Sequence, residues 1–162
     1  MTDEPTRSLP PAPKPERPRD LLGRPLPAGS TNLLHLPEFD LLGVDENHAL
    51  AIELFEAGNY FGAHEAWETC WAQCKGTAEE EFFKGFAQLG AGYTHWLRGN
   101  PRGVAALLGR ALTRIRTLGS PYRGINVDAF ARTLEVDVAT ARDLGRGELP
   151  ELGERRVPRA AR

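Results

Sequence analysis

The sequence contains few cysteines and no long apolar run. Its 162 residues include two cysteines, Cys70 and Cys74, and a single methionine. No window comes near the roughly 20 apolar residues of a membrane-spanning helix. Prolines alternate with charges at the beginning, where a secretory signal would need an apolar run. A disulfide between cysteines four residues apart in one helix would be strained, so we expect two reduced thiols. These absences exclude a disulfide-rich secreted domain and predict a cytoplasmic protein without a membrane-spanning segment.

Proline is unevenly distributed, and its distribution divides the chain. Eight of the thirteen prolines lie in residues 1–31, where they block helix and sheet hydrogen bonding and leave little apolar surface to bury. We therefore predict a disordered, proline-rich arm over residues 1–31 and an extended lead-in over residues 32–44. A single helical domain is predicted over residues 45–144, followed by a flexible basic tail over residues 145–162.

Apolar residues recur at helical spacing through the middle of the chain, which predicts an all-α fold: a compact antiparallel bundle of about five helices with disordered tails. The clearest stripe has offsets of four, three, four and three residues: Phe82, Phe86, Leu89, Tyr93 and Trp96. The same segment contains Gly85, Gly90 and Gly92. Because a glycine inside a helix costs about 1 kcal/mol relative to alanine, these residues predict a very close approach by a neighbouring helix.

Pairs of glycine and asparagine mark two of the expected helix boundaries. Gly58 precedes Asn59 and Gly99 precedes Asn100, so each pair predicts a helix stop followed by the cap of the next helix. Pro101 then suits the first position of the fourth helix. The pairs stand 41 residues apart, a spacing that common turn chemistry explains without an internal repeat.

Further caps are expected for the first and third helices. Asp45 or Asn47 can cap the first helix, and Thr77 followed by Glu80 forms a capping box for the third. A loop over residues 121–128 is expected before the fifth helix.

A polar layer is predicted between the second and third helices. These helices are joined by a tight turn near Gly76, so they are expected to run antiparallel. Residues equidistant from the turn then face each other: His64 faces Gln88, and Glu68 faces Lys84. Glu65 and His95 extend the layer. The candidate polar layer therefore comprises His64, Glu65, Glu68, Lys84, Gln88 and His95.

The chemistry of this layer has several interpretations. His64 and Glu65 begin a His-Glu-x-x-His zinc motif, but Glu68 stands where the second histidine is required. His64, Glu68 and His95 are candidates for holding a divalent metal such as zinc or ferrous iron. Alternatively, Glu68 orients His64 as a general base. The remaining interpretations are a structural layer of hydrogen bonds that sets helix register and a ligand pocket without catalysis.

Charge is segregated along the chain. Nine acidic residues and one basic residue lie between Asp45 and Glu81, whereas residues 82–127 contain seven basic residues and no acidic one. On the expected fourth helix, Arg102, Arg110 and Arg114 project away from the apolar face. They form a candidate basic face for a phosphate-rich partner. The alternative is a solvated face that pairs with the acidic helices or with a second subunit.

The central motif resembles a known family. Asn-Tyr-Phe-Gly-Ala-His-Glu-Ala-Trp-Glu begins at Asn59, and Phe-Lys-Gly-Phe-Ala-Gln-Leu begins at Phe83. With Arg-Gly-Asn from Arg98, the order and spacing resemble domain-of-unknown-function family 309 over about residues 49–118. The resemblance implies a small all-helical protein, usually prokaryotic, with no established activity. By this resemblance, the motif positions of the family correspond to His64, Glu65, Trp67, Glu68, Trp71, Gln88, His95, Gly99 and Asn100.

The leading hypothesis is a non-enzymatic binding or interaction module that uses the polar layer, or the arginines of the expected fourth helix, to hold a small polar ligand or a protein partner. One alternative is a metal-dependent or acid–base hydrolytic enzyme that uses His64, Glu68 and His95. A second alternative is nucleic-acid association through the candidate basic face. No cofactor is predicted, although a divalent metal fits one alternative. No membrane partner is expected, and a homo-oligomer is an alternative use of the basic face.

Overall fold

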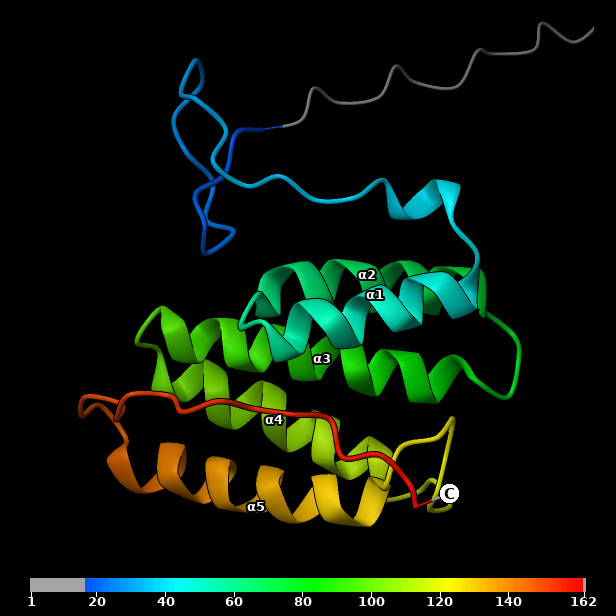
Figure 1. The fold of residues 1–162 in the computed structure, drawn as a ribbon. Coiled ribbons are helices and arrows are strands. Elements are labelled where there is room, and N and C mark those ends of the chain that lie inside the picture. The colour runs from blue at the N-terminus through cyan, green and yellow to red at the C-terminus, as the bar shows by residue number, and fades with distance from the viewer. Residues whose placement is uncertain (1–16, 162) are drawn as a thin grey trace, which may run out of the picture. The chain divides into compact units, whose positions relative to one another are not determined.

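The computed structural model describes residues 17–161 and has five α-helices. They are α1 (Val44–Glu56), α2 (Tyr60–Gln73), α3 (Glu80–Leu97), α4 (Pro101–Ile115) and α5 (Val127–Leu144), preceded by the 3-10 turn η1 (Phe39–Leu41). No strand is present among the described residues, where β-type pairing is limited to isolated bridges. The all-α prediction with five packed helices is confirmed. Figure 1 shows α3 between α1 and α2 on one side and α4 and α5 on the other.

The chain divides into two units, residues 1–34 and residues 35–162. Within the first, residues 1–16 of the predicted proline-rich arm lie outside the described residues. The following segment forms a turn in which Arg19 and Pro25 make an antiparallel bridge. Asp20 Oδ1 accepts the backbone N–H groups of Leu22 and Arg24, at 2.9 and 2.8 Å. The described part of the arm therefore contains local hydrogen bonding that its proline content does not predict.

Asparagine side chains cap three of the helices. Asn59 Oδ1 accepts the N–H of Gly62 at 2.9 Å, and Asn100 Oδ1 accepts the N–H of Gly103 at 3.1 Å. The glycines that precede them have positive φ values, which end α1 and α3 without a Cβ penalty. The caps expected for α2 and α4 are confirmed. Asn126 caps α5 in the same way.

The caps expected for α1 and α3 are wrong. α1 begins after Gly43, and Asn47 is buried with its amide nitrogen donating to the Phe39 carbonyl at 2.9 Å. The N-cap of α3 is Glu79, two residues after the expected Thr77. The Thr77 hydroxyl donates to the Cys74 carbonyl and accepts the N–H of Glu79 at 3.3 Å, and a Glu80 carboxylate oxygen accepts the N–H of Gly76 at 3.2 Å. These side chains therefore stabilise the turn before α3 instead of forming a capping box.

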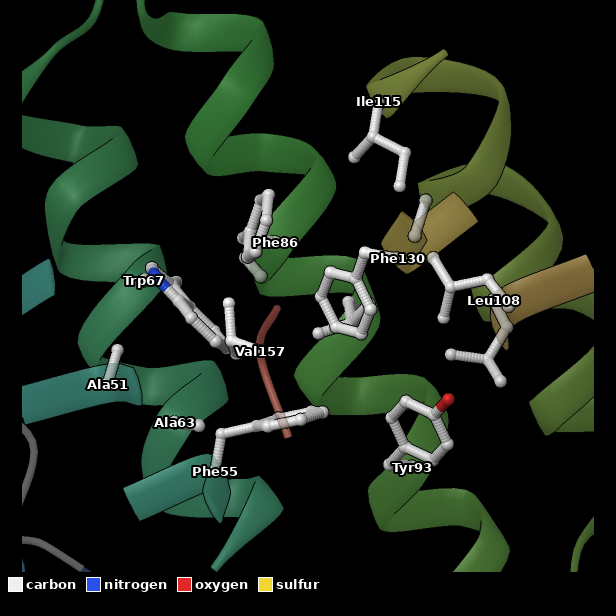
Figure 2. Close-up of a cluster of buried hydrophobic side chains, with 14 of the residues drawn as sticks. Ala51, Phe55, Ala63, Trp67, Phe86, Tyr93, Leu108, Ile115, Phe130 and Val157 are labelled. Atoms are coloured by element: carbon white, nitrogen blue, oxygen red, sulfur yellow. The ribbon is translucent and has the colours of Figure 1, made fainter. Parts of the chain in front are cut away.

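The apolar stripe of α3 forms the centre of the core. Four of its five residues are fully buried, and Trp96 is 5% exposed. Around them lie aromatic side chains from other helices, and Figure 2 shows Phe55, Trp67, Phe86 and Phe130 gathered in this interior. Phe55 makes edge contacts with Tyr93 and Phe130 at centroid distances of 5.6 and 6.0 Å. Such pairs add to the free energy of burial because ring edges and faces carry opposite partial charges.

The segment after α5, for which the sequence predicts a flexible basic tail, contributes to this core. Val157 is 3% exposed and lies among the buried side chains in Figure 2. The backbone pairs with the loop before α5, where Asn126 N–H donates to the Pro158 carbonyl at 2.9 Å. Trp96 Nε1 donates to the Pro150 carbonyl at 2.9 Å. Val157 and these two hydrogen bonds join the segment to α3 and to the start of α5.

A buried carboxylate, Asp137 of α5, depends on the same segment. The Tyr93 hydroxyl donates to Asp137 Oδ2, and Arg155 binds both carboxylate oxygens at 2.9 and 3.0 Å. Asp137 is 3% exposed, so its charge would be strongly destabilising without these donors.

The cysteines and the helices agree with two further expectations. Cys70 and Cys74 are both buried and free. No helix among residues 17–161 has the length and apolarity needed to span a membrane.

Replacing Arg155 by alanine should lower the free energy of unfolding by about 3 kcal/mol, because it leaves the buried Asp137 carboxylate without its cation. Urea denaturation measures the change. Arg156→Ala is the matched control: this exposed neighbour pairs only with Glu154 among the described residues, and its loss should cost less than about 0.5 kcal/mol. Equal effects of the two substitutions would contradict a structural role for the Asp137 pair.

His48 supplies a pH-dependent part of the stability. It is buried against Phe82 and Phe83, and its Nδ1 accepts the indole N–H of Trp67 at 3.0 Å. Its Nε2 has no hydrogen-bond partner among the described residues. Burial, together with repulsion from Arg123 and Arg159, lowers the pKa of His48 from 6.5 to about 4. Between pH 6.5 and 4 the unfolded chain therefore binds the extra proton.

Folding stability should consequently fall as the pH decreases through this window, and the contribution of His48 at pH 5 should be about 2 kcal/mol smaller than at pH 7. Urea denaturation at both pH values, on the wild type and on His48→Gln, isolates the effect. The glutamine variant should be less stable at pH 7 but should show a shallower pH dependence. Parallel pH profiles would mean that His48 does not titrate in this way.

Candidate functional site

His64 lies on the second turn of α2, where α3 approaches most closely. A Cβ built on Gly90 of α3 would stand 2.8 Å from the Cα and backbone nitrogen of His64. Real Cβ atoms do not approach backbone so closely, so only glycine permits this packing at position 90. Gly92 faces α4, where a Cβ would meet the Leu108 side chain at 2.5 Å and the Leu108 backbone nitrogen at 3.1 Å. The close helix approach predicted from the α3 glycines is confirmed.

Both nitrogens of the His64 ring have partners. Nδ1 lies 2.7 Å from the Ala87 carbonyl, and Nε2 lies 2.9 Å from Glu68 Oε2. A carbonyl only accepts, so Nδ1 carries a hydrogen and donates it to Ala87. The other ring nitrogen, Nε2, is therefore directed at a carboxylate. In the neutral ring this nitrogen has a lone pair.

A second carboxylate completes the cluster. His64, Glu65 and Glu68 each offer one nitrogen or oxygen atom, and these atoms lie within 4.8 Å of one another. His64 and Glu65 are half-buried, while the Glu68 side chain is 53% exposed. We call these three residues the His64 cluster. It is the only such group of three or more His, Cys, Asp or Glu residues within the described part of the chain.

The carboxylates change the protonation of His64. Burial lowers its pKa, but the hydrogen bonds to Glu68 and Ala87 raise it by more, so the pKa lies above its ordinary value. The hydrogen bond from His64 lowers the pKa of Glu68. The cluster thus has two forms: an imidazolium paired with Glu68 below the raised pKa of His64, and a neutral imidazole beside two carboxylates above it.

The remaining residues of the predicted polar layer have other partners. Lys84 lies over the Trp71 ring, with Nζ 5.3 Å from the centroid. Gln88 Oε1 accepts from Arg114 Nε of α4 at 3.0 Å. The predicted register is correct to within one turn, since His64 contacts Ala87 and Gly90 on either side of Gln88.

His95 lies beside the start of α4. Its Nδ1 is 3.0 Å from the side-chain nitrogen of Asn100. A Cβ on Gly103 would stand 2.7 Å from its ring, so the ring packs on the first turn of α4. Burial lowers the pKa of His95, and Arg98 lowers it further. His95 is not part of the His64 cluster.

The candidate basic face is also divided. Arg114 is ion-paired with Glu81 and bonded to Gln88. Arg102 and Arg110 are exposed, and neither side chain makes a hydrogen bond or ion pair within residues 17–161.

Two hollows lie elsewhere on the molecule. One, of about 270 Å³, lies between α4 and α5 and includes Arg102, Arg142 and Arg146. Another, of about 230 Å³, includes Tyr60 and Arg155. Neither is lined by a residue of the His64 cluster. Arg142 and Arg146 were not predicted as site residues, although the sequence shows two arginines close together at and just after the end of the fifth expected helix.

The fold and the cluster together define a small helical protein with a histidine–carboxylate site on its second helix. Residues 49–107 match the family model for a domain of unknown function, DUF309. The match confirms the resemblance noted in the sequence, and it extends from α1 into α4, including His64, Gln88 and His95. No curated protein and no solved structure matches the chain.

Gly90→Ala should lower the free energy of unfolding by about 1–3 kcal/mol, because the added methyl group forces the backbones of α2 and α3 apart. Gly109→Ala on α4 is the matched control. A Cβ there would meet only Arg142 Nη2, at 3.6 Å, so alanine should leave stability unchanged or raise it by up to about 1 kcal/mol. Urea denaturation compares the two. Equal destabilisation would contradict the close contact at Gly90.

Proposed function

We propose that this protein is a non-enzymatic binding module whose His64 cluster holds a divalent transition-metal ion. The observation that carries the proposal is the fixed orientation of His64. Its Nδ1 donates to the Ala87 carbonyl, and its Nε2 faces the carboxylate of Glu68. Histidines that bind metals usually have this arrangement, in which a carbonyl holds one ring nitrogen and leaves the other for the ion.

The donor atoms suit a borderline or moderately hard cation. One imidazole nitrogen and two carboxylate oxygens are ligands of zinc, manganese and ferrous iron. Atoms bound to one such ion at about 2.1 Å lie roughly 3.5 Å apart, so small rotations of the glutamate side chains from their present positions complete the site. Three protein ligands leave at least one coordination position for water or for an oxygen of a bound partner.

The surroundings favour binding over catalysis. Glu68 is exposed, so an ion can reach the cluster directly from solvent. An enzyme usually encloses its substrate in a concave site, and the linings of the hollows described above consist of other residues. An ion on an exposed helix edge is suited to capturing a polar ligand or a carboxylate of a partner through its open position.

The main competing arrangement is an ion pair alone. His64 and Glu68 stand one helical turn apart, and a protonated histidine in this position stabilises a helix without any ligand. The two arrangements differ in their response to protons, because a metal ion must displace the proton from Nε2.

Titration calorimetry with zinc, and separately with manganese, should show one ion bound per chain at pH 7. Glu68→Gln should weaken the affinity by at least about tenfold, because it removes a charged ligand. Binding should also weaken as the pH falls below the raised pKa of His64, and it should release a proton, detectable as a buffer-dependent heat. Glu53→Gln, an exposed glutamate of α1, is the control and should bind as the wild type does.

Absence of binding by either ion, or equal affinity of the wild type and Glu68→Gln, would contradict the proposal and leave the ion pair as the role of these residues. Thermal unfolding of both variants without metal establishes that they are folded. Loss of an exposed pair should cost less than about 1 kcal/mol.

A further inference from the structure

The arginines of α4 and α5 differ in whether they are paired. Arg114 of α4 and Arg116 directly after it form ion pairs with glutamates of other helices. The side chains of five arginines on or directly after α4 and α5 make no hydrogen bond or ion pair with any described residue: Arg102, Arg110, Arg132, Arg142 and Arg146. The chain has 22 acidic and 20 basic residues, so this group is not the consequence of a shortage of carboxylates.

Three of the five surround one hollow. Arg102, Arg142 and Arg146 line the space of about 270 Å³ between the beginning of α4 and the end of α5. These ends meet because α4 and α5 run antiparallel, as Figure 1 shows. Arg142 lies in the last turn of α5, and Arg146 follows the helix directly after Gly145. Nη2 of Arg142 lies 3.6 Å from the position of a Cβ on Gly109 of α4. The Arg142 guanidinium therefore reaches across to α4.

The other lining residues include the small or apolar Pro101, Ala105 and Ala141. Their short side chains leave the hollow open and give it an apolar wall. A concave apolar wall with a few charged groups at its rim is typical of sites for small molecules.

The positive potential comes from the arginines themselves. The hollow lies at the amino end of one helix and the carboxyl end of another, so the partial charges of the two helix dipoles oppose each other. None of the three arginines is paired with Asp143 or with another carboxylate in the described structure. Three guanidinium groups around one space repel one another, and an anion with two negative charges would remove most of this repulsion.

We propose that this hollow binds the phosphate group of a small phosphorylated molecule. Guanidinium groups form paired, charge-assisted hydrogen bonds with phosphate oxygens, and the wall of Ala105 and Ala141 contacts the uncharged part of the ligand. The hollow holds one small molecule, whereas a nucleic acid would need charged contacts along its length. The site shares no residue with the His64 cluster, so the phosphate proposal and the metal proposal are tested independently of each other.

The test measures binding of inorganic pyrophosphate and of adenosine monophosphate to the full chain by titration calorimetry at physiological salt. Arg142→Gln should weaken both by at least about tenfold, since one charge-assisted pair is lost. Arg132→Gln is the matched control, because it removes an unpaired arginine of the same helix that does not line the hollow. Its affinities should stay within about twofold of the wild type.

Ala105→Leu keeps every charge and fills the hollow, so it should weaken adenosine monophosphate more than pyrophosphate. Circular dichroism establishes that each variant is folded. Failure of both probes to bind the wild type, or equal weakening by Arg142→Gln and Arg132→Gln, would overturn the proposal; Arg142 would then only complement the carboxyl end of α5. Arg142-dependent binding of a short single-stranded oligonucleotide, without binding of either small probe, would overturn it in favour of a polyanion surface.

Discussion

The structure depends on the contact between Gly90 of α3 and the backbone of His64 in α2. Because a Cβ at position 90 would stand 2.8 Å from His64, no other residue allows the two helices to come so close. A Cβ on Gly92 would meet Leu108 of α4, mainly through its side chain. These two glycines place α3 in the middle of the helices, as Figure 1 shows. Its aromatic stripe is then buried from both sides, and the Ala87 carbonyl comes within hydrogen-bond distance of the His64 ring.

Much of this fold could be predicted from the sequence, because its signals are local. The caps at Asn59 and Asn100 involve residues only three positions apart, and the α3 stripe follows from helical periodicity. The prediction failed at Asn47 and Thr77, which have the side chains of good caps. Asn47 instead satisfies the Phe39 carbonyl of η1 and faces Gln73 of α2. This contact joins segments that are brought together only by the tertiary structure. A capping rule considers neighbouring residues in the sequence and therefore does not predict it.

The candidate site also combines contacts within one helix, which could be predicted, with contacts between helices, which could not. His64 and Glu68 share one helix at the spacing of a single turn, and the sequence was sufficient to bring them together. Gln88 and His95 were expected beside them, but their side chains face Arg114 and Asn100, on or just before α4. A displacement of less than one turn in the register of α3 moves a side chain from one neighbour to the other. The register of α3 is set by close contacts between helices, such as the contact at Gly90. Counting residues from the turn does not give the register to that precision.

The segregated charge of the sequence has a structural counterpart in ion pairs between distant segments. Glu79 and Glu81, from the acidic part of the chain, pair with Arg123 and Arg114 from the basic part. The chain has 22 acidic and 20 basic residues, so its composition alone does not require an arginine to lack a carboxylate partner. Arg102, Arg142 and Arg146 nevertheless surround one hollow without a carboxylate among the described residues. Because mutual repulsion among the three opposes folding, their arrangement is better explained by an anion bound there than by the overall composition of the chain.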